Sequence, residues 1–337
     1  MSDIRNSTFA SIAIIGSGSF GTSLAYLLGE RCERLTLIGR DPHVAQQINA
    51  THHNPKYLSD TRLHDRVRAS VKLDDAADHD LIIFSVPTSA TRSTAAALAA
   101  IGTNAALISS AKGIERATGD RMSQILRDFY PRNPLAVISG PNHAEEIACR
   151  QATCAVIGSH DQEYAAALQK LFTLPHFRTY TSMDIAGIEL GGAIKNIYAI
   201  AAGIASGLGL GDNAIAALVT RALSEMTRLG VALGGQRDTF TGLSGLGDLI
   251  ATCFSHHSRN HRVGLALGKG MALNDAVAGI GMIAEGVPNT QSIYEAARAA
   301  DVSTPIIDAV FSILYQDRPA ALALRDLLSR DPRPEND

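Results

Sequence analysis

Gly16-Ser17-Gly18-Ser19-Phe20-Gly21 is the stretch that decides the fold of this 337-residue chain. An apolar run at residues 12–15 precedes it, and a helical run at 22–28 follows it. In a strand-turn-helix unit the first glycine permits a tight turn, the second lets the backbone approach a pyrophosphate, and the third lets helix and strand pack closely. A glycine turn without a ligand would share the same letters. The flanking strand and helix favour a dinucleotide, with the amides at the helix start facing its pyrophosphate.

The rest of the first half repeats this alternation of short β-branched runs and longer Ala-rich segments, which is typical of a doubly wound α/β domain with a parallel sheet. We expect this Rossmann-type domain to cover residues 1–182. The expected strands are 12–15, 35–38, 67–71, 81–86, 105–110, 135–139, 153–157 and 177–180, and the expected helices are 22–28, 44–51, 89–100, 121–129, 142–149 and 161–171.

From about Met183 the strand-like runs stop and Ala/Leu/Gly-rich helical stretches take over, which predicts an all-helical second domain at 183–329. Residues 242–248 carry too much glycine for a helix interior, so we expect a loop or tight turn there. The polar residues 330–337 are expected to form a disordered tail. The expected helices are 184–207, 213–233, 261–267, 273–278, 290–299, 306–315 and 319–328.

Composition narrows the possible partners. A hydrophobic content of 46%, a charged content of 19% and a net charge of -3 indicate a globular protein without the broad basic field that nucleic acid requires. Four cysteines without a CxxC pair predict reduced thiols in the cytoplasm, and residues 1–10 do not resemble a secretion signal. The uncharged stretches 93–111 and 197–211 are interpreted as buried helix and strand rather than membrane spans.

The end of the second expected strand indicates which dinucleotide is bound. An acidic residue there bonds the ribose 2′-hydroxyl, whereas an arginine accommodates a 2′-phosphate. Arg40, which follows Gly39, therefore favours NADP, while Asp41 leaves NAD open and Pro42 is expected to begin the next helix. A solvated surface charge is the alternative for Arg40.

Lysines are the candidates for a proton donor to a carbonyl that accepts a hydride. Lys195, followed by Asn196, is the only charged residue between Leu190 and Gly211, so it either reaches the helix edge or faces a cleft. Lys112 follows the strand at 105–110, at the sheet edge where such folds bind ligands.

Two further segments are candidates for ligand contacts. Gly140 and Asn142 leave another strand at the same edge, where they could supply backbone amides and a helix start. Ser258, Arg259 and Asn260 precede a helical run, which would suit a substrate phosphate. His256, His257 and His261 cluster without a cysteine or carboxylate to complete a metal site, so we expect no metal.

Seven motifs lie in order along the chain, at 16–22, 110–115, 138–141, 190–196, 245–249, 258–260 and 285–286. With them the chain resembles the bacterial NAD(P)-dependent glycerol-3-phosphate dehydrogenases over nearly its whole length. The resemblance implies reduction of dihydroxyacetone phosphate to sn-glycerol 3-phosphate for phospholipid synthesis, and a homodimer. One departure is the pair Asn142 and His143, where the family often has Ser or Thr and then Phe.

Carried over by motif, Lys195 would be the proton donor or acceptor, and Asp248 would orient its ammonium group. On its own, Asp248 would be a turn residue. The resemblance implies substrate contacts at Lys112, Gly140, Asn142, Lys195, Asn196, Asp248, Ser258, Arg259 and Asn260, and cofactor contacts at Gly16, Gly18, Ser19, Phe20, Gly21, Arg40, Lys112, Ala144, Arg259, Ile283 and Glu285.

Two other functions remain open at this point. A dehydrogenase of a hydroxyacid or sugar acid would share both domains, although Ser258-Arg259-Asn260 favours a phosphate. A non-catalytic dinucleotide sensor would use its helical half for a partner protein and would not need Lys112 and Lys195 at these places.

Overall fold

The first half of the chain forms one eight-stranded sheet in the computed structural model, which describes residues 9–329, 331 and 334. The strand order is β3-β2-β1-β4-β5-β6-β7-β8. Strands β2 and β3 are added on one side of β1, and β4 to β8 are added on the other side. This is the doubly wound arrangement that the sequence predicts. The strands are β1 (Ser11–Ile15), β2 (Arg34–Ile38), β3 (Val67–Ser70), β4 (Leu81–Phe84), β5 (Ala106–Ser109), β6 (Leu135–Ser139), β7 (Thr153–Gly158) and β8 (Phe177–Ser182).

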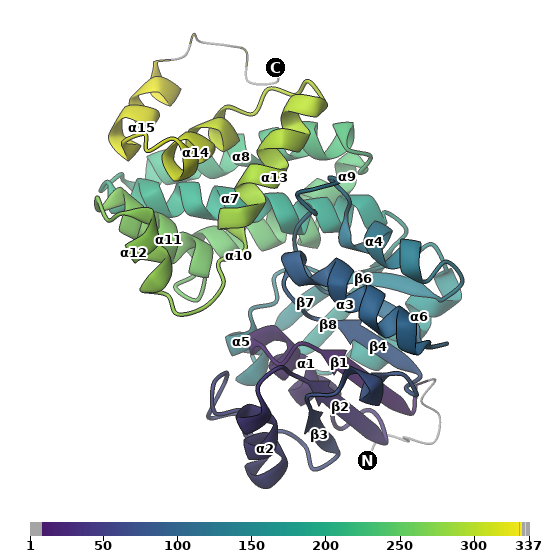
Figure 1. Cartoon of the computed structure of the whole chain (residues 1–337). Helices are drawn as coiled ribbons and strands as arrows, with labels where there is room; N and C mark the ends of the chain where they lie inside the picture. The colour runs from purple at the N-terminus through teal and green to yellow at the C-terminus, as the bar shows by residue number, and fades with distance from the viewer. Residues whose placement is uncertain (1–8, 330, 332–333, 335–337) are drawn as a thin grey trace.

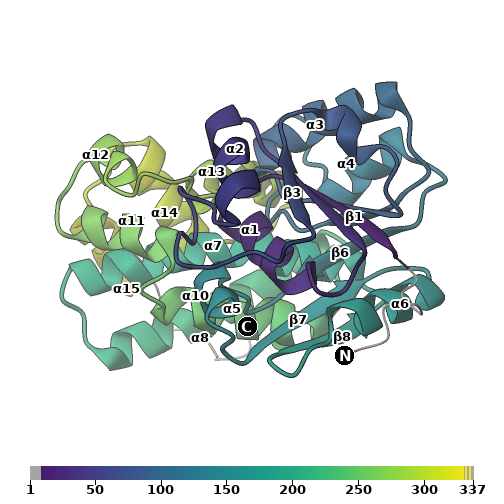
Figure 2. The same ribbon diagram turned by 90° about the horizontal axis from the view of Figure 1, so that it is seen from below.

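Helices cover both faces of the sheet because its strands are apolar on both sides. In β1, Ile12 and Ile14 belong to one hydrophobic cluster, whereas Ala13 and Ile15 belong to another. Helices α3 and α4 pack on one face and α1 and α6 on the other (Figure 2). The helices of this half are α1 (Ser19–Leu28), α2 (Pro42–Thr51), η2 (Leu73–Ala76), α3 (Thr88–Ile101), α4 (Met122–Phe129), α5 (Ala144–Ala148) and α6 (Gln162–Phe172).

The sheet departs from the expected parallel arrangement at one point, because β7 runs antiparallel to β6. The connection contains only α5, a five-residue helix. Such a helix spans about 7.5 Å, less than half the length of a five-residue strand, so it does not return the chain to the start of β6. The last two strands are parallel to each other but opposed to the rest.

The second half is all-helical, as predicted, and packs around the long central helix α7 (Figure 1). Within the described residues, α7 alone is long and apolar enough to cross a membrane, but 94% of its most apolar window is buried inside the protein. The helices are α7 (Ile185–Gly207), α8 (Asp212–Ala232), α9 (Arg237–Thr241), η3 (Leu243–Gly247), α10 (Asp248–Phe254), α11 (Arg259–Gly268), α12 (Leu273–Ala278), α13 (Gly286–Ala299), α14 (Pro305–Tyr315) and α15 (Ala320–Leu328).

The loop expected at 242–248 is wrong. Residues Leu243–Gly247 form a π-helical turn that leads directly into α10, and neither α9 nor α10 was predicted. Glycine serves close packing here, because a Cβ on Gly191 of α7 would lie 2.6 Å from the Ser244 carbonyl oxygen. The turn thus rests on the backbone of α7 and directs Asp248 toward it.

Further expectations from the sequence can be compared with the structure. Helix α2 begins at Pro42, as expected, whereas α1 begins at Ser19, three residues earlier than predicted. All four cysteines lie within the described residues and are free thiols. The tail expected at 330–337 falls, apart from Asp331 and Pro334, outside the described residues.

Helices α7 and α11 touch through glycines on both sides of their crossing. A Cβ on Gly203 would lie 2.1 Å from the His261 carbonyl oxygen, and one on Gly264 would lie 2.1 Å from the Ile200 carbonyl oxygen. These separations leave no room for a methyl group. The contact holds the start of α11 beside the middle of α7, where Lys195 and Asn196 are found.

We expect Gly264→Ala to destabilise the protein by about 1–3 kcal/mol, the usual cost of overpacking, even though alanine is the better helix former. Gly211→Ala is the control, since a Cβ there meets no atom within 4 Å. Urea unfolding measures both variants. Equal or higher stability of Gly264→Ala would contradict the close crossing.

Candidate active site

The glycine-rich turn lies between β1 and α1 with the geometry that its sequence predicts. Gly16 has a φ of +117°, and a Cβ there would lie 2.3 Å from the Ser85 carbonyl oxygen. A Cβ on Gly21 would overlap the carbonyl oxygen of Gly16. A Cβ on Gly18, by contrast, meets no atom within 4 Å, which leaves space for a pyrophosphate beside the start of α1. These residues fit a bound dinucleotide.

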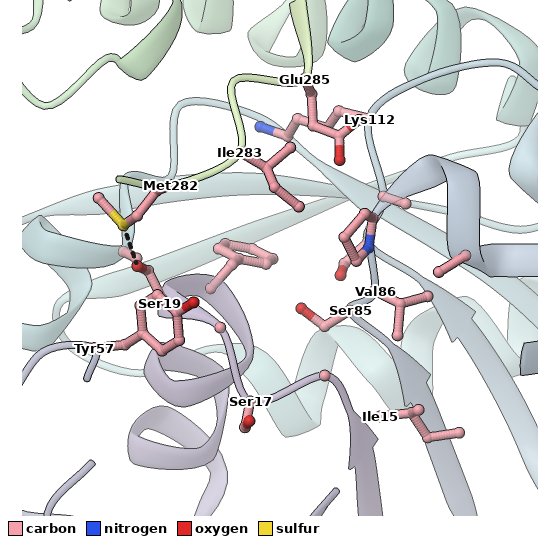
Figure 3. A pocket seen from close by; sticks show the side chains of 18 of the residues that line it. Ile15, Ser17, Ser19, Tyr57, Ser85, Val86, Lys112, Met282, Ile283 and Glu285 are labelled. Carbon is pink, nitrogen blue, oxygen red and sulfur yellow. Dashed lines mark hydrogen bonds between the residues drawn. The ribbon is translucent and has the colours of Figure 1, made fainter. Parts of the chain in front are cut away.

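A cleft of about 740 Å³ extends from this turn to the helical half of the protein. Ser19 and Tyr57 point into it from one side and Met282 and Ile283 from the other (Figure 3). Two predicted site residues do not line it: Gly21 lies under the turn, and Gly140 lies behind Lys112. The predicted residues that do line it are Gly16, Gly18, Ser19, Phe20, Arg40, Lys112, Asn142, Ala144, Lys195, Asn196, Asp248, Ser258, Arg259, Asn260, Ile283 and Glu285.

Asp248 lies between the two lysines at the far end of the cleft. Its Oδ1 is 2.9 Å from Lys195 Nζ, and its Oδ2 is 2.7 Å from Lys112 Nζ. The three side chains come from α10, from α7 and from the loop after β5. Both Lys195 and Asp248 are almost fully buried, so neither charge is well hydrated. Two positive charges and one negative charge therefore share a site with little water.

The pKa values of this group reflect burial and mutual attraction. Burial lowers the pKa of Lys195 to about 8, against the opposing attraction of Asp248. Burial alone would raise the pKa of Asp248, but the two ammonium groups outweigh it and hold that pKa below its usual range. Asp248 is therefore ionised, and Lys195 can gain or lose a proton near neutral pH.

Thr252 completes the contacts of Lys195 and was missed in the sequence. Lys195 Nζ donates to Thr252 Oγ1 at 2.6 Å, and that hydroxyl donates to the Asp248 carbonyl oxygen at 2.6 Å. Thr252 lies four residues after Asp248 on α10, so the two side chains share a face. Expecting a loop instead of a helix near Asp248 hid this spacing.

The segment after β6 holds Lys112 from a second side. Lys112 Nζ donates to the Gly140 carbonyl oxygen at 3.1 Å and to Asn142 Oδ1 at 3.0 Å. Asn142 is buried, and among the described residues its Nδ2 has no partner. A buried donor without a partner is costly, so this amide is available to a ligand in the cleft. Helix α5 itself has only five residues.

The start of α11 contains a network of amides. Asn260 Nδ2 donates to Asn196 Oδ1 at 2.9 Å, and Asn260 Oδ1 accepts from the backbone N–H of Gly286 at 2.9 Å. Ser258 Oγ accepts from the His261 N–H and so caps the helix. Arg259 lies beside them at the helix start and donates to the Ile283 carbonyl oxygen at 3.1 Å.

At the other end of the cleft, Arg40 and Asp41 have different surroundings. Arg40 is exposed and lines the cleft. Asp41 caps α2, because its Oδ1 accepts from the backbone N–H groups of His43 and Val44. In the sequence, Asp41 keeps NAD possible as the cofactor. In the structure its carboxylate is engaged in capping α2.

The segment before α13 closes the side of the cleft opposite α1. Ser19 Oγ is 3.9 Å from Met282 Sδ, the contact drawn as a dashed line in Figure 3. Burial raises the pKa of Glu285, which lines the cleft near Lys112. Sequence reasoning missed Met282, and it missed Lys56 and Tyr57, which also line the cleft. Their sequence carries no glycine or charge pattern that indicates a ligand.

Comparisons with known proteins identify the family. The family model for the N-terminus of NAD-dependent glycerol-3-phosphate dehydrogenase matches residues 11–165, and the model for its C-terminus matches residues 184–325. The glycerol-3-phosphate dehydrogenase [NAD(P)+] of Clostridium tetani is 42% identical over 98% of this chain and 95% of its own. That of Nitratidesulfovibrio vulgaris is 43% identical over 96% of this chain and 99% of its own.

A solved structure extends the likeness to three dimensions. The crystal structure of glycerol-3-phosphate dehydrogenase from Coxiella burnetii superposes with a TM-score of 0.92 at 34% identity, covering 95% of this chain and 99% of that one. Both domains are thus matched. The group formed by Lys195, Asp248 and Lys112 lines the same cleft as the glycine-rich turn, whose residues fit a dinucleotide. The chain belongs to the NAD-dependent glycerol-3-phosphate dehydrogenase family.

Proposed function

We propose that the protein catalyses the reversible, NAD(P)H-dependent reduction of dihydroxyacetone phosphate to sn-glycerol 3-phosphate, with Lys195 as the proton donor. The observation that carries the proposal is the contact of Asp248 with both Lys195 and Lys112 at the end of the cleft remote from Gly18. Such a group places an acid and a positive field where a ketone can lie.

A bound NAD(P)H supplies the hydride that reduces the carbonyl carbon. Lys195, in its ammonium form, stabilises the negative charge that develops on the carbonyl oxygen and transfers a proton to it. Asp248 orients that ammonium group and favours its charged form. In the reverse direction the neutral amine of Lys195 takes the proton from the alcohol.

The remaining side chains support a small phosphorylated substrate. Lys112 supplies a second cation beside the ketone, and the Nδ2 of Asn142 supplies a donor that the protein leaves unused. Arg259 and the capped start of α11 suit the phosphate, since they combine a guanidinium fork with a helix N-terminus. The hydrogen bond from Asn260 to Asn196 links the start of α11 to α7 beside this pocket.

For the cofactor we propose a preference for NADP, carried by Arg40. The exposed guanidinium lines the cleft after β2, where a 2′-phosphate would lie, and Asp41 is engaged in capping α2. Four free cysteines support a reducing compartment, so we place the enzyme in the cytoplasm. We also propose a homodimer and a role in supplying the glycerol backbone of phospholipids, as the resemblance to the family implies.

The direct test of the activity is to mix pure protein with NADPH and dihydroxyacetone phosphate and to follow the absorbance of the reduced cofactor. Lys195→Met should lower turnover by about 10²–10⁴-fold, the usual contribution of a general acid, because it keeps the length of the side chain but removes its proton. NADPH binding, followed by fluorescence, should stay unchanged.

The matched control is Lys269→Met, which changes an exposed lysine of the same domain. It should keep full activity. Normal turnover in Lys195→Met would remove this lysine from the mechanism, and absence of NADPH oxidation by the wild-type protein would overturn the proposed reaction itself.

The cofactor preference has its own test. Arg40→Ala should raise the Michaelis constant for NADPH by about tenfold or more, as the loss of a charge-assisted contact worth 1.5–3 kcal/mol implies, and should change that for NADH little. Steady-state kinetics with each cofactor measures both constants. An equal rise for both cofactors would show that Arg40 does not read the 2′-phosphate.

A further inference from the structure

We propose that Asn289 of α13 is a positioning residue for Lys112. The side chain of Asn289 holds the backbone of Lys112, while Asp248 holds the Lys112 side chain. This inference rests on the proposed function, because it concerns the same cleft. Asn289 does not line the cleft and is not part of any motif that the sequence singles out.

The contact is short, buried and remote in sequence. Asn289 Nδ2 donates to the Lys112 carbonyl oxygen at 2.7 Å across 177 residues of chain. Only 2% of Asn289 is exposed, so water does not replace the donor when it is lost. The bond joins a helix of the second half to the loop after β5 in the first half.

The neighbouring residue shows how closely this loop is held. A Cβ on Gly113 would lie 2.5 Å from Asn289 Oδ1 and 2.4 Å from Thr88 Oγ1. The loop after β5 therefore passes between the start of α3 and the second turn of α13, where a Cβ on Gly113 would displace the side chains of Thr88 and Asn289. Asn289 forms one wall of this gap as well as the hydrogen bond.

Helix α13 is itself fixed to the substrate end of the cleft. The Gly286 N–H donates to Asn260 Oδ1, and a Cβ on Gly286 would lie 2.8 Å from the Asn196 carbonyl oxygen. Asn289 lies one turn further along the same helix. The helix thus sets the position of Lys112 relative to α7 and α11.

A displaced Lys112 would change the charges around Lys195. Lys112 Nζ contacts Asp248, which contacts Lys195, so a displaced Lys112 loosens the whole group. Because Lys112 lowers the pKa of Lys195, its displacement would also move the pH at which Lys195 titrates upward. A residue that only stabilised the fold would not change this pH.

The experiment compares two substitutions of nearly equal size. Asn289→Leu removes the donor at every pH, whereas Asn289→Asp places a carboxyl group there that donates only when protonated. We expect kcat/KM for dihydroxyacetone phosphate to fall about 10- to 100-fold in Asn289→Leu below pH 7, where Lys195 is protonated in both proteins, and its decline at high pH to begin at a higher pH than in the wild type. Below pH 7 the ratio of Asn289→Asp to wild type should rise at least fivefold as the pH falls, because the acid form restores the bond.

Thr290→Val is the control, since Thr290 is equally buried on the same helix but donates only to Gly286 of its own helix. It should keep wild-type kinetics. If Asn289→Leu does not fold, as judged by circular dichroism, Asn289→Ala takes its place. Wild-type kinetics in the Leu or Ala variant, or an Asn289→Asp ratio that is flat with pH, would overturn the proposal.

The result is separable from the activity itself. If the wild-type protein does not oxidise NADPH with dihydroxyacetone phosphate, the proposed function fails. If the wild-type protein is active and the variants match it, only the role of Asn289 fails.

Discussion

The carboxylate of Asp248 between the ammonium groups of Lys195 and Lys112 is the interaction on which the site depends. It joins three segments that are far apart in sequence: the middle of α7, the start of α10 and the loop after β5. Breaking one side of a buried ion pair is costly, because the charge that remains has neither water nor partner. The two halves of the protein are therefore fixed to each other at the cleft.

The packing around this group explains why so many of the buried neighbours are glycine. Gly191 lets the π-helical turn before Asp248 approach α7, and Gly203 and Gly264 let α11 cross α7 in backbone contact. Each close approach brings polar side chains to one place without a bulky residue between them. The excess positive charge of the group is suited to an anionic substrate, which would complete the balance.

Much of the fold follows from the sequence, for identifiable reasons. The strand before Gly16 and the helix after Gly21 predict the dinucleotide turn, because the glycine pattern has one meaning in that context. The reversal at β7 is not marked by strand periodicity, which is the same in either direction. The helix at Asp248 was hidden by Gly242, Gly245 and Gly247, of which Gly245 serves close packing, since a Cβ there would lie 2.2 Å from the Phe240 carbonyl oxygen.

The site was predictable to a similar extent. Lys195 stands out as the only charged residue between Leu190 and Gly211, and motifs locate Asp248 and Arg259. Geometry alone places Thr252 and Asn289 beside the two lysines: one shares a helix face with Asp248, and the other reaches a backbone carbonyl 177 residues away. No local pattern marks such contacts, so only the assembled structure shows them.

The most direct test of the central interaction is the pH dependence of turnover in the wild type and in Asp248→Asn. In the proposed mechanism reduction requires the ammonium form of Lys195, whose pKa is about 8, so the wild-type rate should fall as the pH rises through this value. Removing the carboxylate removes the attraction that favours the ammonium form, so the fall in Asp248→Asn should begin at a lower pH by about one unit or more. A fall in the Asp248→Asn rate that begins at the wild-type pH, or at a higher pH, would contradict the account.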